Sequence, residues 1–413
     1  MKVILLIGYL LTASAGYLLR ALNLRHLKRH GAEVPAGFEG AVDRELLART
    51  AAYTVELSRV GLVASLVDNI VLLLFIFGGL LGAYDRWIAS LGCSFVTAGV
   101  LFFAGISLAG MALDIPFNAY STFRIENRYG FNTTSARLWL ADLAKSACIG
   151  LFLLALLSCG ALAIVHASPR FWWLWVWLFS ALTTLFTIYL APYVIEPLFN
   201  TFEPVRDEGV EEEIRTLLAK AGLSVSRVLQ VDASRRSRHS NAYFTGIGRV
   251  KRIVLYDTLL QQMRHGEILS ILAHEAGHWK RGHIRKRLLF LEAGGLAFLY
   301  VAFRLLAWGG LPGLVGLSQA SFAGQAVILA FVGSLAAFPF SPLGSWLSRR
   351  HEWEADRFAC DLTGAPEDLA TALIKLSREN LANLHPHPLY ARFYYSHPPV
   401  VERVRRLREK QEN

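Results

Sequence analysis

The stretch ILAHEAGHWKRGH, residues 271–283, holds two histidines four positions apart, with a glutamate directly after the first. The motif continues a helical apolar pattern from Ile268, Leu269, Ile271 and Leu272. His274 and His278 are therefore expected on one helix face, one turn apart. That spacing lets two imidazoles reach one zinc ion, and it puts Glu275 beside the open coordination position as a general base. So short a motif also arises by chance, and its weight depends on the rest of the chain.

A third metal ligand is required, and the sequence offers two places to look for it. The metzincin pattern needs a histidine six residues after His278, but that position is Ile284. His283 stands about 100° away on a continuous helix. We therefore interpret His283 as a surface or headgroup-facing side chain, and we expect its removal to change neither metal binding nor activity.

The segment SRRHEWEADRFA, residues 348–359, offers a glutamate from a separate helix instead. Glu352 and Asp356 lie one helical turn apart, so Glu352 can bind zinc while Asp356 accepts a hydrogen bond from a ligand histidine and fixes its tautomer. Taken alone, the segment also fits an ordinary acidic surface helix. Its position after an HExxH motif, in a membrane protein, favours the metal site.

The composition is that of an integral membrane protein. Of 413 residues, 54% are hydrophobic and 18% are charged, and the mean hydropathy is positive, whereas soluble domains are about 45–50% apolar and about 25% charged. The first apolar segment also has features of a signal peptide, but the charge distribution argues against that interpretation. Seven segments are apolar and long enough to cross a bilayer core of ~30 Å: 3–21, 61–83, 93–113, 143–165, 171–195, 287–308 and 322–346.

Basic and non-basic loops alternate along the chain. Arginines and lysines gather after the first, third, fifth and seventh segments, whereas the loops between carry Arg86, Arg170 or no charge. By the positive-inside rule, the N-terminus is outside and both hydrophilic blocks, 197–286 and 347–413, face the cytoplasm. This topology and anionic lipid headgroups account for the net charge of +10, so we infer no nucleic-acid partner. The four cysteines form no CxxC knuckle and suggest no disulfide framework.

The two hydrophilic blocks carry the remaining structural signals. The first predicts an amphipathic helix at 211–223, a strand at 227–234, and two short strands joined by a glycine-containing turn and followed by a helix within 240–260. The second predicts helices broken at prolines. The predicted organisation has four parts: a five-helix membrane region (1–196), the first part of a protease domain (197–286), two membrane helices (287–346) and its second part (347–413).

The motifs together resemble those of the integral-membrane zinc metalloproteases typified by the type I CAAX prenyl endopeptidase. HEAGHWKRGH and RRHEWEADRFA match the two zinc motifs of that family, and SNAYFTG, KRIVLYDTLL and YYSHPPVVERV match its active-site edge and C-terminal motif. FRIENRYGFN at 123–132 and YVIEPLFNTFEPV at 193–205 are similar to further family signatures. The resemblance covers almost the whole chain. It implies seven transmembrane helices around a hydrated chamber, with a gluzincin-like α+β protease domain on the cytoplasmic side.

The resemblance also implies a role for each residue of the zinc motifs. His274, His278 and Glu352 match the zinc ligands, Glu275 matches the general base, and Asp356 matches the carboxylate that supports a ligand. Zn²⁺ is therefore the expected cofactor.

Three further positions match residues that handle the substrate in that family. Asn241 matches a residue beside the edge strand that holds the substrate backbone, and His397 and Arg403 match a pair near the scissile carbonyl. Edge strands commonly hold extended peptides, and a donor near the metal would stabilise an oxyanion. From the residues alone, Asn241 also fits a turn, His397 a helix start and Arg403 a lipid-facing charge.

The leading hypothesis is a zinc-dependent membrane endopeptidase that hydrolyses peptide bonds near the C-terminus of prenylated or other membrane-presented peptides. Its expected partners are therefore the lipid bilayer and a peptide or lipidated peptide. A membrane quality-control metalloprotease is the first alternative, and a seven-helix transporter or receptor with an accidental HExxH is the second. The excess of arginine over lysine favours a bacterial inner membrane over the endoplasmic reticulum. Asp68, Asn69 and Glu292, inside apolar segments, fit either a hydrated chamber or local pairing between helices.

Overall fold

The computed structural model describes residues 1–245 and 252–409. Within that part of the chain, seven helices are long and apolar enough to cross a membrane, which confirms the seven predicted segments. They are α1 (Lys2–His30), α2 (Arg44–Phe77), α4 (Phe95–Tyr120, extended by η1, Ser121–Glu126, and α5, Asn127–Tyr129), α6 (Ala136–Ala167), α7 (Trp172–Val194), α11 (His283–Trp308) and α13 (Phe322–Ala337), which continues through η4 (Phe338–Phe340) into α14 (Ser341–Thr363).

The second span differs from its predicted bounds at both ends. α2 begins at Arg44, where the side chain of Asp43 accepts a hydrogen bond from the backbone of the first turn. It ends at Phe77 because Gly79 adopts a left-handed conformation, with φ of 88°, and a short helix α3 (Leu80–Ser90) follows. Hydropathy alone sees neither feature, since the first turns of α2 are polar and the apolar run crosses the break.

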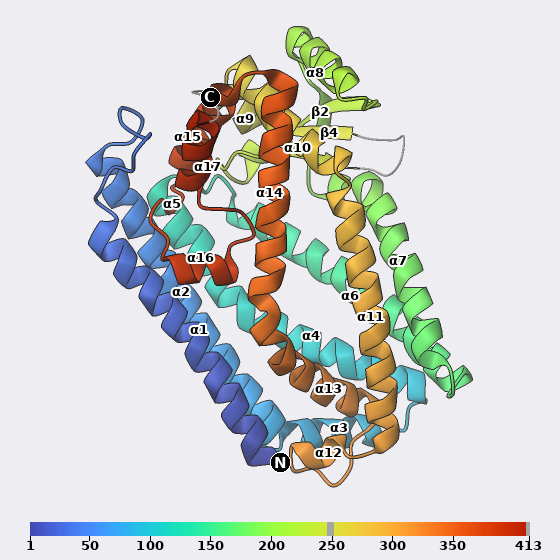
Figure 1. Ribbon diagram of the computed structural model, residues 1–413. Helices are drawn as coiled ribbons and strands as arrows, with labels where there is room; N and C mark the ends of the chain where they lie inside the picture. The colour runs from blue at the N-terminus through green and yellow to red at the C-terminus, as the bar shows by residue number, and fades with distance from the viewer. Residues whose placement is uncertain (246–251, 410–413) are drawn as a thin grey trace.

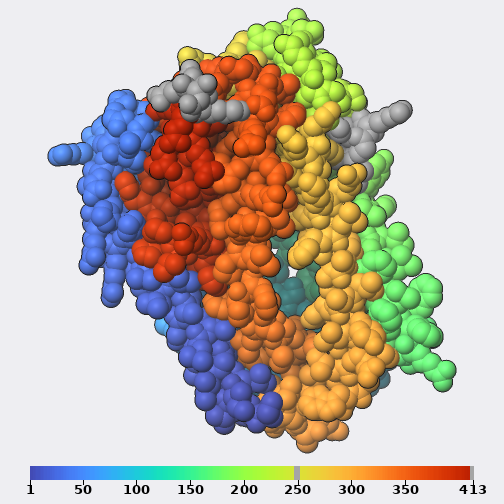
Figure 2. All heavy atoms as spheres, in the orientation of Figure 1, coloured from blue at the N-terminus to red at the C-terminus, as the bar shows by residue number. Residues whose placement is uncertain are grey.

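The membrane helices are arranged around a common centre (Figure 1). Figure 2 shows a hollow there, which opens between α11 and α14, with the helices of the N-terminal half behind it. Few residues of these helices are fully buried in the protein: 6% of the most apolar window is buried in five of the seven spans. An apolar cluster draws the helices together at the end of the molecule that carries α3 and α12 (Leu311–Leu314), with Ile76, Leu81, Phe102, Leu311 and Ile328 among its buried members.

Of the polar residues inside apolar segments, Asn69 forms hydrogen bonds with a neighbouring helix. Asn69 of α2 accepts a hydrogen bond from the hydroxyl of Tyr9 and donates one to that of Tyr17, both on α1. Asn69 therefore holds two neighbouring helices together, whereas Asp68 beside it is exposed.

The first hydrophilic block folds into a four-stranded sheet covered by helices. β1 (Phe202–Pro204), β2 (Arg227–Val231), β4 (Arg252–Tyr256) and β3 (Ala242–Thr245) lie in that order; only β2 and β4 pair in parallel. Three helices accompany the sheet: α8 (Glu208–Lys220), α9 (Asp257–Gln262) and α10 (His265–Lys280). Their apolar faces meet in a core that includes Ile214, Leu218, Ile253, Leu255 and Leu272.

The predicted elements of this block are present, with three differences. The amphipathic helix predicted at 211–223 is α8, which begins and ends three residues earlier, because Asp207 caps its first turn. β1 was not predicted, because three residues that end in proline carry no alternation to detect. β2 ends at Val231, and residues 232–234 of the predicted strand turn into a short 3-10 helix, Ala233–Arg235. The predicted glycine-containing turn at 246–251 lies outside the described residues.

The second hydrophilic block is helical as predicted. α14 is followed by α15 (Pro366–Glu379), α16 (Pro388–Tyr394) and α17 (Val400–Glu409). Proline stands at the start of α15 and α16, where its missing N–H removes no helical hydrogen bond. Because α14 continues the last membrane span, it passes directly into the second hydrophilic block and packs along α10.

Candidate metal site

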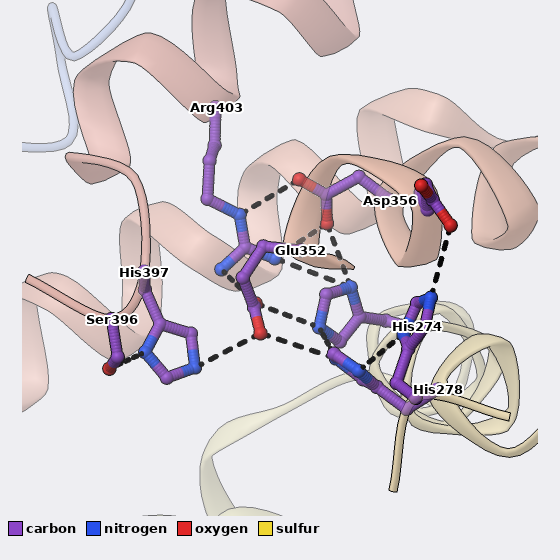
Figure 3. A network of polar contacts seen from close by, with 9 residues as sticks. His274, His278, Glu352, Asp356, Ser396, His397 and Arg403 are labelled. Atoms are coloured by element: carbon purple, nitrogen blue, oxygen red, sulfur yellow. Dashed lines mark hydrogen bonds and ion pairs between the residues drawn. The ribbon is translucent and has the colours of Figure 1, made fainter. Parts of the chain in front are cut away.

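Two helices, α10 and α14, bring three candidate metal ligands together. His274 and His278 project from α10 and Glu352 projects from α14, and one ligand atom of each lies within 4.8 Å of the other two. The two Nε2 atoms are 3.3 Å apart, and each lies 3.3 Å from an oxygen of Glu352 (Figure 3). The structure thus brings together the three residues predicted as ligands.

A glycine inside the first motif allows this close packing. A Cβ atom at Gly277 would lie 3.0 Å from the Cα of Ala355 and 3.2 Å from its carbonyl oxygen. Any larger residue would therefore push α10 away from α14. The glycine of HEAGH thereby sets the distance between the histidines and Glu352.

The donor atoms fit a bound cation. Glu352 is 4% exposed, and each of its carboxylate oxygens lies 3.3 Å from the Nε2 atom of one of the two histidines. A buried carboxylate is costly unless positive charge compensates it. Two neutral imidazole nitrogens and one carboxylate converging on one point form a donor set that zinc binds, with a fourth position left open.

Asp356 and Arg403 form a buried charged pair behind His274. Asp356 Oδ1 lies 2.8 Å from His274 Nδ1, and the guanidinium of Arg403, on α17, donates to both carboxylate oxygens at 2.6 and 2.9 Å (Figure 3). Arg403 Nη1 is also 3.8 Å from Glu352. The side chain of Arg403 is only 9% exposed, so its guanidinium is enclosed by protein next to the ligands.

The electrostatics of His274 follow from this arrangement. Burial lowers its pKa, but the contacts with Asp356 and Glu352 outweigh burial and raise the pKa to about 9. Burial likewise lowers the pKa of Arg403, and the charge of Asp356 reverses the direction. In the metal-free protein His274 is therefore protonated on both ring nitrogens, and a metal that binds Nε2 must displace the proton there.

Glu275 follows His274 on α10 and is partly buried. Burial raises the pKa of its carboxyl group, and the neighbouring histidines oppose that effect. A carboxylate with a raised pKa is better matched to proton transfer near neutral pH than an ordinary one.

His397 stands at the open side of the cluster, in the turn between α16 and α17. Its Nε2 atom is 3.4 Å from Glu352 Oε1, and its side chain is 63% exposed. Ser396 Oγ lies 2.9 Å from the other ring nitrogen, Nδ1. The imidazole thus reaches the ligand cluster while one face stays accessible.

Asn241 directly precedes β3 and is exposed. Its side-chain oxygen accepts a hydrogen bond from the backbone of Ala242 at 2.8 Å, and its carbonyl accepts one from Tyr256 at 3.1 Å. β3 is an edge strand of the sheet and contacts α10, the helix that carries the two histidines.

The predicted surface position of His283 is wrong. His283 is 4% exposed; its Nδ1 atom lies 3.1 Å from Nδ1 of His278, and its Nε2 atom lies 3.1 Å from Glu354. The prediction assumed a continuous helix, but α10 ends at Lys280, and Gly282 adopts a φ of 67° before α11 begins at His283. A glycine directly before the histidine was the available signal for this break.

A second polar cluster, which sequence reasoning missed, lies behind the segment that leads to Asn241. His239 Nε2 is 3.4 Å from Glu126 of η1, and His239 Nδ1 is 2.8 Å from the side chain of Asn380. Tyr53 of α2 donates to Glu126 at 2.7 Å, and the ring of Phe131 stacks on His239 with centroids 4.2 Å apart. The cluster ties the approach to β3 to the membrane helices.

Comparisons with known proteins agree with this architecture. Residues 23–201 match the family described as CAAX prenyl protease N-terminal, five membrane helices, and residues 204–411 match peptidase family M48. The chain is 35% identical over 320 residues to a CAAX prenyl protease 1 homolog of Arabidopsis thaliana, covering 74% of this chain and 72% of that protein. It is 31% identical over 332 residues to CAAX prenyl protease 1 of Saccharomyces cerevisiae, covering 76% and 73%. The crystal structure of S. mikatae Ste24p superposes with a TM-score of 0.91, 25% identity and 98% coverage of both chains.

Proposed function

This chain belongs to peptidase family M48, beside the CAAX prenyl proteases, and from that premise we propose that it is a zinc endopeptidase acting on membrane-presented peptides. Family membership makes it a membrane metalloendopeptidase and removes the interpretation of HExxH as accidental. The proposed bond is near the C-terminus of the substrate, and prenylated CAAX-type peptides are the leading class. The observation that carries the proposal is the His274–His278–Glu352 cluster, in which Glu352 stands on the helix that continues the last membrane span.

We propose zinc as the metal because two imidazole nitrogens and one carboxylate oxygen form a donor set typical of catalytic zinc. His274, His278 and Glu352 would hold it. A bound zinc ion supplies polarisation of the scissile carbonyl and acidification of the attacking water.

Glu275 is the proposed general base. It would take the proton of the attacking water and deliver it to the leaving amine, a role that its position after His274 and its raised pKa support. His397 would donate from Nε2 to the carbonyl oxygen as that oxygen becomes an oxyanion. Its exposed side chain beside Glu352 supports this role.

Arg403 and Asp356 are proposed as positioning residues. The Arg403 guanidinium is buried and occupied by Asp356, which makes it poorly placed to reach a peptide. It would instead hold Asp356 against His274 Nδ1, so that His274 presents Nε2 to the metal.

The substrate would lie as an extended strand along the edge of β3. A peptide added there would take its backbone hydrogen bonds from the free edge of β3, and Asn241 stands at the start of that edge. The hollow would admit an extended chain and exclude a folded domain. The positive loops support a cytoplasmic active site, and the composition supports a bacterial inner membrane over the endoplasmic reticulum.

The test uses the purified full-length protein in detergent. We expect about one zinc ion per chain, and cleavage of a farnesylated CAAX peptide that is faster than cleavage of the same peptide without the lipid. Glu275→Gln should keep the zinc and lose at least about 10²-fold in activity, because it removes the base and no ligand. A wild-type protein without stoichiometric metal would overturn the metalloprotease assignment, and equal rates for both peptides would overturn the lipidated substrate.

A further inference from the structure

His278 presents its two ring nitrogens to different neighbours. Nε2 faces the ligand cluster, 3.3 Å from His274 Nε2 and 3.3 Å from Glu352. Nδ1 faces away from the cluster and lies 3.1 Å from Nδ1 of His283. The second histidine of the motif is thus supported by another histidine, and not by a carboxylate directly.

The proton positions along this contact are determined once His278 is a metal ligand. A metal-binding imidazole is neutral and binds through a lone pair, so a His278 that binds through Nε2 carries its one proton on Nδ1. Within the described part of the chain, the acceptor in reach of that proton is Nδ1 of His283, 3.1 Å away. His283 consequently carries its own proton on Nε2, where the carboxylate of Glu354 accepts it at 3.1 Å.

The surroundings of His283 hold its ring in this orientation. The side chain is 4% exposed, and the ring of His351 stacks on it with centroids 4.1 Å apart and an interplanar angle of 8°. Glu354 is also 3.4 Å from Arg350, so its charge is balanced on the far side. Because His283 is the first residue of α11, the contact joins a membrane helix to a metal ligand.

The two ligand histidines therefore reach a carboxylate by different routes. His274 Nδ1 meets Asp356 directly at 2.8 Å, whereas His278 Nδ1 meets Glu354 through the ring of His283. We propose that His283 is a positioning residue of the metal site: it fixes the tautomer and orientation of His278 by accepting its Nδ1 proton, and Glu354 fixes the tautomer of His283. The inference rests on the proposed metal site and assigns a role to a residue that the motif leaves out.

The test measures zinc affinity, not only activity. Metal-free protein in detergent is titrated with zinc against a chromophoric chelator at fixed pH. His283→Leu removes the acceptor and keeps the bulk, and we expect it to weaken zinc binding about 10–100-fold, the usual cost of losing such a support. His283→Asn puts an amide oxygen near the position of the imidazole Nδ1, so it should recover most of the lost affinity. His265→Ala, an exposed histidine at the start of α10, is the matched control and should bind as wild type does.

A second arm tests the order of the relay. Glu354→Ala should weaken zinc binding in the wild-type background and have no further effect in His283→Leu, because its influence passes through His283. The d–d absorption spectrum of the cobalt-substituted protein should change in His283→Leu and return toward wild type in His283→Asn. If His283→Leu does not fold, the other two variants provide the test. Near wild-type zinc affinity in His283→Asn with weaker binding in Glu354→Ala supports the role of His283, and wild-type affinity in Glu354→Ala contradicts it.

The outcomes separate this inference from the proposed function. Wild-type zinc affinity in His283→Leu, equal weakening in His283→Leu and His283→Asn, or additive losses with Glu354→Ala would each overturn the role of His283 while leaving the metal site intact. Failure of the wild-type protein to bind zinc would instead overturn the site itself.

Discussion

The metal site has a buried half and an open half, which differ in the exposure and the pairing of their side chains. His274, Glu352, Asp356 and Arg403 all have side chains that are at most 9% exposed, and ionic contacts link them to one another. His397, by contrast, is 63% exposed and touches the cluster only through Glu352. A group enclosed on all sides can organise a metal but cannot reach a peptide. Burial therefore separates the groups that hold the metal from those that meet the substrate.

In the buried half, the stability of the protein depends on every charge keeping its partner. Each charge there is compensated by a neighbour, and removing one partner leaves another charge buried and unpaired, which typically costs about 3–5 kcal/mol. Exposed groups carry no such penalty, because water can solvate whatever remains. Substitutions in the buried half should thus disturb the metal and the fold, and those in the open half should disturb catalysis alone.

Glu352→Ala should give the largest effect in the buried half. It removes a metal ligand, so both bound zinc and activity should fall to the detection limit. Zinc per chain by mass spectrometry and peptide cleavage measure the two losses. Glu402→Gln, an exposed glutamate on α17, is the control and should retain both. Stoichiometric zinc in Glu352→Ala would show that a residue other than Glu352 is the third ligand.

His397→Ala should give the largest effect in the open half. If His397 donates to the oxyanion, it acts mainly in the transition state, and kcat should fall about 10²–10³-fold. Zinc content should not change, because the residue is not a ligand. Steady-state kinetics on zinc-loaded protein test both points. Loss of zinc, or a rise in KM with kcat unchanged, would make His397 a structural or substrate-binding residue.

Asp356→Asn tests whether a residue of the buried half acts on metal binding alone. The amide keeps the shape and an acceptor for His274 Nδ1, but it removes the charge nearest to Arg403 and leaves Glu352, 3.8 Å from Nη1, as the remaining carboxylate. We expect zinc affinity to fall about 10–100-fold, with most of kcat restored at saturating zinc. Chelator competition followed by kinetics in excess zinc measures this. A kcat that stays low in zinc-saturated protein would place Asp356 in the chemical step.

Sequence reasoning anticipated the parts of the molecule that depend on local periodicity. The seven spans follow from hydropathy, and His274, His278, Glu352 and Asp356 were predicted together because each pair lies one turn apart on its own helix. Where the chain changes direction, periodicity fails. The break at Gly282 rotates His283 into the site, and a prediction that extends the helix past it puts that residue on the surface.

The open half was harder to predict for a different reason. Asn241 and His397 lie in segments outside regular helices, so nothing in their spacing relates them to the metal, and only the family resemblance pointed to them. The cluster around His239 was missed because its members are far apart in the chain: Glu126 and Asn380 meet there only in the folded molecule.

Asn241→Ala should have a smaller effect of a different kind. One backbone contact to the peptide is lost, and a hydrogen bond of about 0.5–1.5 kcal/mol corresponds to roughly a 2- to 10-fold change. Because that contact already exists in the ground state, KM should rise and kcat should hold. Progress curves over a range of peptide concentrations separate the two. A fall in kcat with KM unchanged would put Asn241 with His397 among the groups that act in the transition state.

The smallest expected effect concerns the support behind the open half. The hydrogen bond to Glu126 raises the pKa of His239 above its ordinary value of about 6.5, and burial opposes this shift only in part. A histidine whose pKa is raised on folding stabilises the protein fully below the pKa of the unfolded chain, and that stabilisation is lost as pH rises through the higher folded pKa. The contribution of the pair should therefore be complete below pH ~6.5 and fall as the pH rises from there through the raised pKa of the folded protein.

Thermal unfolding in detergent at several pH values measures this contribution. The ring is partly exposed, so solvent screening keeps the effect small, on the order of 1–2 °C in Tm. His239→Gln should remove that part of the pH dependence while keeping a polar side chain beside Asn380, and Glu126→Gln should remove the same part. An unchanged pH profile in both variants would show that the ion pair does not anchor the segment leading to Asn241. The aromatic stack of Phe131 on His239 and the ion pair between Arg236 and Asp142 of α6 would then be among the contacts that hold this segment to the membrane helices.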